Sequence, residues 1–163
     1  MKRIWIMGLS AVFAAAAADA QVARRPFLPA VLQLELAERA RDACAAGGFD
    51  VGVAIADASG LVRTQVSGDT AGSVAIETAR RKAMSAVLVG FPTAKLGDAV
   101  REAPAYADML RSLHPDMIFI GGGVPIRIDG QLVGAIGVGG ASGGAADEAC
   151  ATKALTALAD KLK

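Results

Sequence analysis

The stretch Ile126-Arg-Ile-Asp-Gly-Gln-Leu-Val133 decides the fold, because its Asp129-Gly130 pair predicts a two-residue hairpin turn between two strands. A type I′ turn needs positive φ at both central positions, and Asp and Gly tolerate that conformation. Strands joined by so short a turn must pair antiparallel. The sheet that contains them is therefore predicted to be antiparallel.

A second hairpin is predicted nearer the N-terminus, where two β-rich runs, 51–57 and 61–67, flank the turn residues 58–60. The apolar run 117–120 predicts a fifth strand. Helical spacing of apolar residues predicts helices over 31–46, 73–89, about 93–103, 104–113 and 145–163. Because these helices need a sheet face to cover, we expect an α+β fold with a five-stranded antiparallel sheet and flanking helices.

The first twenty residues are typical of a signal peptide. Lys2 and Arg3 give a basic start, an apolar run follows to Ala18, and Ala18-Asp-Ala20 is a cleavage pattern. The alternative, an uncleaved anchor, needs roughly 20 apolar residues, which this run does not reach. We expect a signal peptide over 1–20, a single domain over 21–163 and a periplasmic or secreted protein.

Charge excludes two classes of partner. Cleavage after Ala20 removes two of the 17 basic residues and one of the 16 acidic residues, so the remaining chain is formally neutral. Nucleic-acid binding needs a basic footprint, and membrane-surface binding needs a basic amphipathic stripe. The sequence predicts neither partner, and no later segment is apolar enough to span a membrane.

The two cysteines, Cys44 and Cys150, match no zinc spacing. Export would allow a disulfide between them. Both fall in predicted helices, where a free cysteine commonly packs as a small apolar residue. The sequence favours two free buried thiols.

Four blocks of sequence resemble the GlcG/HbpS family. They are Val53-Ala-Ile-Ala-Asp-Ala-Ser-Gly60, Ala79-Arg-Arg-Lys-Ala83 leading to Pro92-Thr93, Gly122 to Gly140, and Asp147-Glu-Ala-Cys-Ala151. The blocks occur in the family's order and extend over about residues 30 to 162. The resemblance implies a profilin-like fold and assembly of dimers into larger homo-oligomers, often octamers.

The same resemblance implies a small-ligand-binding protein, with haem as the leading ligand. Some relatives are encoded with enzymes of small-molecule catabolism, so a metabolite binder or enzyme is an alternative. A structural partner of a sensor or enzyme is a third. No nucleophile and base pair, phosphate-binding loop or dinucleotide fingerprint occurs, so no motif supports catalysis.

Haem iron needs an axial donor in an apolar pocket, and His114 is the only histidine of the chain. It precedes Pro115 in a predicted loop, so a solvated loop histidine is the simpler interpretation. Tyr106 and Met109, one helical turn apart, are substitute donors, although packing explains such a pair more simply.

The run Gly121, Gly122 and Gly123 can turn backbone N–H groups toward a carboxylate such as a haem propionate, or can serve as a sharp reversal. By the family pattern, Lys82 and Thr93 would add a charge and a hydroxyl. A solvated helix face is the alternative for Lys82, beside Arg80 and Arg81. Asp147 and Glu148, in the first turn of the last helix, are explained by capping and the helix dipole.

Overall fold

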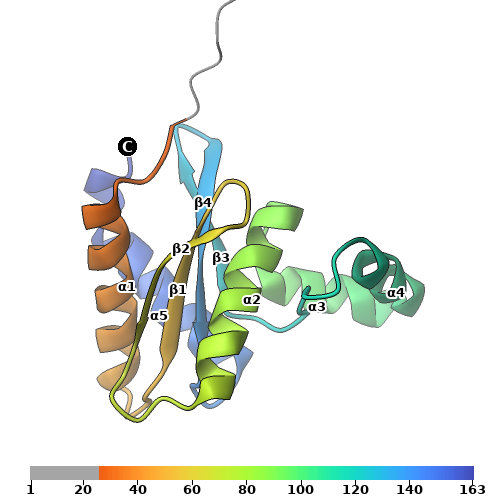
Figure 1. Cartoon of the computed structure of the whole chain (residues 1–163), viewed down its shortest axis with the longest axis horizontal. Coiled ribbons are helices and arrows are strands. Elements are labelled where there is room, and N and C mark those ends of the chain that lie inside the picture. Colours follow the sequence, from red (N-terminus) through yellow and green to blue (C-terminus); the bar gives the residue numbers. More distant parts are fainter. Residues whose placement is uncertain (1–25) are drawn as a thin grey trace, which may run out of the picture.

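The computed structural model describes residues 26–163, with a four-stranded antiparallel sheet between two layers of helices (Figure 1). The strands are β1 (Gly52–Asp57), β2 (Val62–Ser67), β3 (Gly123–Ile128) and β4 (Gln131–Gly139). Helices α1 (Ala30–Ala45) and α5 (Gly144–Ala157) cover one face, and α2 (Ser73–Val89) covers the other. A short 3-10 helix, Ala159–Lys161, follows α5.

The strands lie in the order β2-β1-β4-β3, so the two hairpins meet through β1 and β4 at the centre. In that central pair Gly52 faces Gly139 and Ile55 faces Ile136. The predicted turn is confirmed: φ is 48° at Asp129 and 76° at Gly130. Both values are positive, as a type I′ turn requires.

The predicted strand over 117–120 is wrong, and the described sheet has four strands instead of five. Met117 is buried against Met84, Leu96 and Leu110. The peptide N–H of Ile118 donates to Oγ of Ser85 at 3.0 Å. In a strand, this backbone donor would bind a neighbouring strand, but here it binds a side chain. The apolar run therefore packs as a loop.

The two faces of the sheet are packed differently. The face toward α1 and α5 carries large apolar side chains such as Ile55, Ile126 and Ile136. The layer between the sheet and α2 is built from small residues: Ala54, Ala56 and Ala135 of the sheet, and Ala79, Ala83 and Ala86 of α2, with Val87. At Gly137 a Cβ would collide with the carbonyl oxygen of Ala79, so glycine lets α2 approach the strand closely.

Cys44 of α1 and Cys150 of α5 form a disulfide, so the predicted pair of free thiols is wrong. Their Cα atoms lie 5.4 Å apart, although 106 residues separate them in the chain. That distance lies in the range that a disulfide bridges. The bond joins the two helices that lie together on one face of the sheet.

Helices α3 (Thr93–Glu102) and α4 (Pro104–Leu113) form an arm that projects from the α2 side of the molecule (Figure 1). Within residues 26–163 no helix is long and apolar enough to cross a membrane. The predicted signal peptide and its cleavage site lie outside the described residues.

Candidate functional site

Lys82 lies inside the protein, and its interpretation as part of a solvated helix face is wrong. The residue is 3% exposed. Its Nζ donates to Oδ2 of Asp147 at 2.6 Å and to the carbonyl oxygen of Val138 at 3.0 Å. Successive residues of a helix point about 100° apart, so Arg80 and Arg81 can lie at the surface while Lys82 faces the sheet.

Thr93 and the glycine run meet directly beside Lys82. The peptide N–H of Gly123 donates to Oγ1 of the fully buried Thr93 at 2.9 Å. A Cβ on Gly123 would collide with the carbonyl oxygen of Lys82 and lie 2.7 Å from Cγ2 of Thr93. Gly122 has a φ of +117°, a conformation that favours glycine. The glycines therefore permit both a reversal and close packing.

The N-terminal turn of α5 supplies the carboxylates of this region. Asp147 is 3% exposed, and its Oδ1 accepts from the peptide N–H of Ala141 at 2.9 Å. Glu148 accepts from the peptide N–H of Gly122 at 3.3 Å through Oε2. The anion beside the glycine run is thus a carboxylate of the chain itself. The explanation of Asp147 and Glu148 by capping is wrong, because α5 has no side-chain cap hydrogen bond and both carboxylates bind groups outside the helix.

These residues form one buried unit, here called the Lys82 cluster: Lys82, Thr93, Gly122, Gly123 and Asp147. The family pattern placed Lys82, Thr93 and the glycine run at one ligand pocket; Lys82, Thr93, Gly122 and Gly123 do lie side by side, packed against one another and Asp147. Their polar side-chain atoms point at one another or at the backbone and are hydrogen-bonded. Buried polar groups that are fully paired stabilise a fold without needing a ligand.

His114 directly follows the last residue of α4. Among the described residues, no hydrogen bond joins it to the Lys82 cluster. Within residues 26–163 its Nδ1 is the one buried side-chain nitrogen or oxygen that has no hydrogen-bond partner. The residue as a whole is half-buried. Its backbone is fixed at both ends, because its N–H donates to the carbonyl of Leu110 and its carbonyl accepts from Met117.

An apolar cluster lies beside this loop. Met84, Leu96, Leu110 and Met117 are buried in it, and Tyr106 and Phe119 pack against it. The expectation that Tyr106 would pack is confirmed. Met109 is instead 47% exposed on α4.

A charged network of two arginines and two carboxylates includes Asp116, which is two positions after His114 in the chain. Arg80 donates to Glu77 at 2.7 Å and to Asp116 at 2.9 Å, and Arg81 donates to Glu77 at 2.7 Å. The hydrogen bonds from Arg80 and Arg81 lower the pKa of the Glu77 carboxyl to about 2. The hydrogen bond from Arg80 also lowers the pKa of Asp116. These arginines are held by carboxylates of their own chain.

Comparison with known proteins identifies the family. The family model described as "Haem degrading protein HbpS-like" matches residues 28–156. A search of curated protein sequences gave no match.

Solved structures agree with the family model. A double mutant of HbpS from Streptomyces reticuli is 31% identical, with a TM-score of 0.78 over 91% of this chain and 99% of that one. A second HbpS structure is 32% identical, with a TM-score of 0.78 over 88% of this chain and 99% of that one. A complex of PduOC with haem is 28% identical, with a TM-score of 0.74 over 81% of this chain and 95% of that one. The chain therefore belongs to the HbpS-like family of haem-degrading proteins.

Proposed function

We propose that this protein binds haem through His114. Membership of the HbpS-like family and the 28% identity to PduOC, which was solved with haem, support haem as the ligand. The observation that carries the site is the His114 ring, whose buried Nδ1 has no partner among the described residues. Neutral imidazole is a common axial donor to haem iron.

The surroundings of His114 fit a haem donor. Because the residue is half-buried and its Nδ1 is enclosed, we assign the contact with iron to Nε2. Leu113, which precedes His114 directly, is 74% exposed and offers apolar surface to a macrocycle, beside the buried cluster that includes Leu110 and Met117. When bound there, haem would supply an iron centre, while the chain would supply the nitrogen and the apolar surface.

The propionates need a cation other than Lys82, because the Lys82 ammonium is buried against Asp147. Arg111 lies one turn before His114 on α4, and its side chain is 55% exposed. Its guanidinium lies 4.7 Å from the centroid of the Phe119 ring, which holds it close to the same loop. We therefore assign the propionate contact to Arg111.

Titration of haem into the purified protein tests this function. A stoichiometric Soret band is expected for the wild type, with a shifted band and weaker binding for His114→Ala. Arg111→Gln should weaken binding without moving the band, since it acts through charge alone. Met109→Leu, on the same helix, and Arg101→Gln, on α3, are the matched controls. Unchanged binding by His114→Ala would remove His114 from the site, and a wild type without a Soret shift would refute haem binding.

We further propose that the protein is exported. The signal-peptide pattern supports export, and so does the Cys44–Cys150 disulfide, since such bonds persist mainly in oxidising compartments. Mass spectrometry of the periplasmic and secreted fractions should find a chain that begins at Gln21. Recovery of full-length protein with two free thiols from the cytoplasm alone would refute export.

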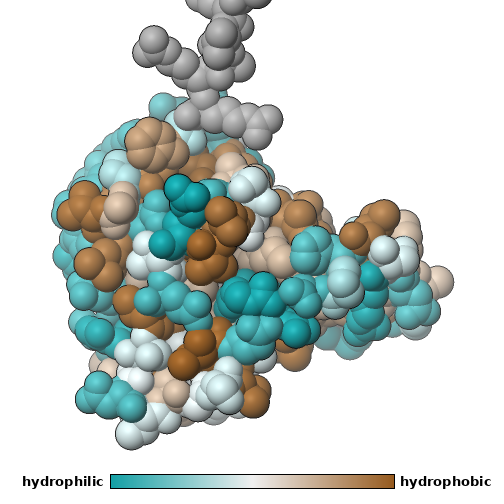
Figure 2. Space-filling view, viewed as in Figure 1, coloured by the Kyte–Doolittle hydropathy of each residue, from teal (hydrophilic) through white to brown (hydrophobic). Residues whose placement is uncertain are grey.

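Assembly into a homo-oligomer is the third part of the proposal. Figure 2 shows apolar side chains among polar ones on the face of the body and on the arm. The large apolar residues that are exposed are Phe27, Val31, Leu34, Leu61, Val74, Leu88, Met109, Leu113 and Ile120. Contacts between subunits would cover part of this surface. Light scattering should give a mass several times that of the 16.4 kDa chain, and a monomer at micromolar concentration would contradict assembly.

A further inference from the structure

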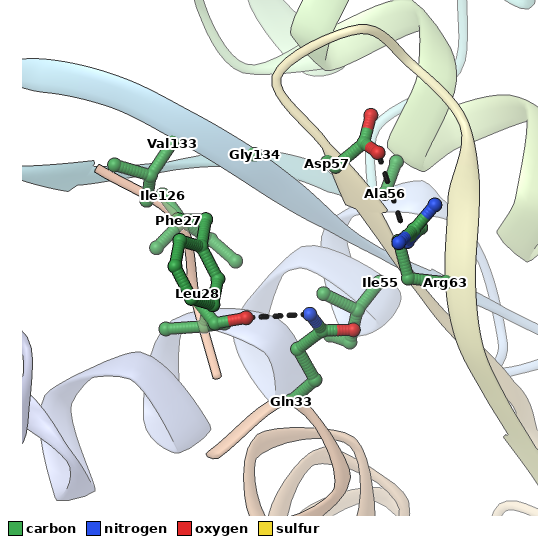
Figure 3. A pocket seen from close by; sticks show the side chains of 10 residues that line it. All are labelled: Phe27, Leu28, Gln33, Ile55, Ala56, Asp57, Arg63, Ile126, Val133 and Gly134. Carbon is green, nitrogen blue, oxygen red and sulfur yellow. Dashed lines mark hydrogen bonds and ion pairs between the residues drawn. The ribbon is translucent and has the colours of Figure 1, made fainter. Parts of the chain in front are cut away.

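A cavity of about 140 Å³ opens at one end of the layer between the sheet and the helices α1 and α5 (Figure 3). It lies apart from His114 and from the Lys82 cluster, and the haem proposal does not use it. The residues that line it are Phe27, Leu28, Gln33, Ile55, Ala56, Asp57, Arg63, Ile126, Val133 and Gly134.

The inner wall of the cavity is apolar and rigid. Leu28, Ile55, Ile126 and Val133 are each at most 5% exposed and belong to the main core. An engineered cavity of about 150 Å³ with a similar lining binds benzene. The volume here therefore suits an apolar group of roughly four to six carbon atoms.

The mouth of the cavity carries polar groups, and most of them are already occupied. Gln33 donates from Nε2 to the carbonyl of Leu28 at 2.6 Å and accepts from Thr64 at 3.0 Å through Oε1. Oδ1 of Asp57 accepts from the N–H of Ser59 and of Leu61 and from the Ser59 hydroxyl, which fixes the β1–β2 turn. Gln33 is thus engaged through both its amide nitrogen and its amide oxygen, while Oδ2 of Asp57 faces Arg63.

Arg63 differs from both. Its Nε lies 3.8 Å from Oδ2 of Asp57, which is too long for a hydrogen bond, and its guanidinium donates no hydrogen bond within residues 26–163. Figure 3 shows Arg63 and Asp57 on one side of the cavity, opposite Ile126 and Val133. A guanidinium presents five N–H donors in a fork that matches a carboxylate. The free hydrogen-bond donors at the mouth are thus the N–H groups of Arg63, whose Nε side forms an ion pair with Asp57.

We infer that this cavity binds a small monocarboxylate with an apolar tail, such as a short-chain fatty acid. The tail would lie against Ile55, Ile126 and Val133, and the carboxylate would accept hydrogen bonds from Arg63. No covalent step is involved. The inference is independent of haem, because it concerns other residues on the other face of the sheet.

Three probes separate the contributions of tail and charge: pentanoate, 1-pentanol, which has the same number of carbons without the charge, and acetate, which lacks the tail. NMR titration of the wild type should show pentanoate binding at least tenfold more tightly than either of the others. Binding should weaken as salt is raised, since the Arg63 side chain is 55% exposed. Nuclear Overhauser contacts should join the pentanoate methyl group to the methyl groups of Ile55, Ile126 and Val133.

Arg63→Gln should weaken pentanoate binding about tenfold, because a charged hydrogen bond is replaced by a neutral one. Arg63→Lys should retain part of the affinity, and Arg101→Gln on the arm should retain all of it. Equal binding of 1-pentanol and pentanoate would overturn the charge assignment. Full affinity in Arg63→Gln would overturn the role of Arg63. Nuclear Overhauser contacts from pentanoate to residues outside the cavity of the wild type would overturn the site itself, and that measurement does not depend on how the glutamine variant folds.

Discussion

Nζ of Lys82 lies 2.6 Å from Oδ2 of Asp147, and both side chains are at most 5% exposed. The two residues are 65 positions apart in the chain, so the pair ties α2 to the first turn of α5 across the end of β4. A buried pair of this kind is balanced only while both partners remain, because a single charge left in the interior is poorly solvated.

Loss of one partner of the ion pair should be strongly destabilising. Lys82→Met and Asp147→Asn are each expected to lower the free energy of unfolding by about 3–5 kcal/mol, since each leaves an unpaired buried partner. The double variant should lose clearly less than the sum. Urea denaturation measures all three. Arg39→Gln, which breaks an exposed pair with Glu35, is the control and should lose at most about 1 kcal/mol.

The hydroxyl of Thr93 should contribute to the free energy of unfolding through a single hydrogen bond. Thr93→Val keeps the shape of the side chain but removes the acceptor for the buried N–H of Gly123, so a loss of about 1–3 kcal/mol is expected. Thr93→Ser keeps the acceptor and should lose less. Chemical denaturation of the two variants side by side is the measurement. A larger loss in Thr93→Ser than in Thr93→Val would show that the methyl group, and not the hydrogen bond, sets the stability.

Reduction of the disulfide should lower the free energy of unfolding of each chain. A cross-link between residues 106 positions apart restricts the unfolded chain strongly, and its removal is expected to lose about 2–5 kcal/mol. Denaturation of Cys44→Ser/Cys150→Ser, compared with the wild type with and without reductant, measures this loss. The wild type should show no thiol that reacts with Ellman's reagent when it is unfolded without reductant. Two reactive thiols under those conditions would contradict the bond.

Glu77 should make stability depend on acid pH. Its pKa is about 2 in the folded protein against an ordinary value of 4.5, because Arg80 and Arg81 favour the carboxylate. The network therefore stabilises the fold fully above pH 4.5. As the pH falls from 4.5 toward 2, the unfolded chain takes up the proton first, and the stabilisation is lost.

Glu77→Gln tests this dependence. At pH 7 it should lose about 1 kcal/mol, since the pair is largely exposed, and the difference from the wild type should vanish near pH 2. Thermal unfolding over this pH range is the measurement. Glu38→Gln is the control, because the Glu38 carboxylate makes no ion pair within the described residues. A difference that persists unchanged at pH 2 would refute the role of the carboxylate charge.

The helices and the two hairpins were predictable because their signals are local. Helix α2 has the bounds expected from periodicity, and the Asp129-Gly130 turn follows from the φ angles that those residues tolerate. Met117 to Ile120 were misassigned because an apolar run of four residues is equally suited to a strand and to a packed loop. The hydroxyl of Ser85, 33 positions away from Ile118, decided between them.

The candidate site was predictable only in part. The family blocks pointed to Lys82, Thr93 and the glycine run as neighbours, but the burial of Lys82 and its partner depend on how α5 docks. Two neighbouring arginines suggested a polar surface, although a rotation of about 100° per residue separates their directions from that of Lys82. The pairing of Cys44 with Cys150 likewise depends on a Cα separation that only the packed helices define.

The bond between Cys44 and Cys150 also closes the chain into a covalent ring. The ring contains all four strands, α2 and the projecting arm, while most of α1 and the second half of α5 lie outside it. A protease that cut the arm after the exposed Arg101 would open the ring without releasing either piece. The nicked molecule would keep its mass, apart from one added water, until a reductant separated the fragments, so a cut in the arm would be visible only on a reducing gel.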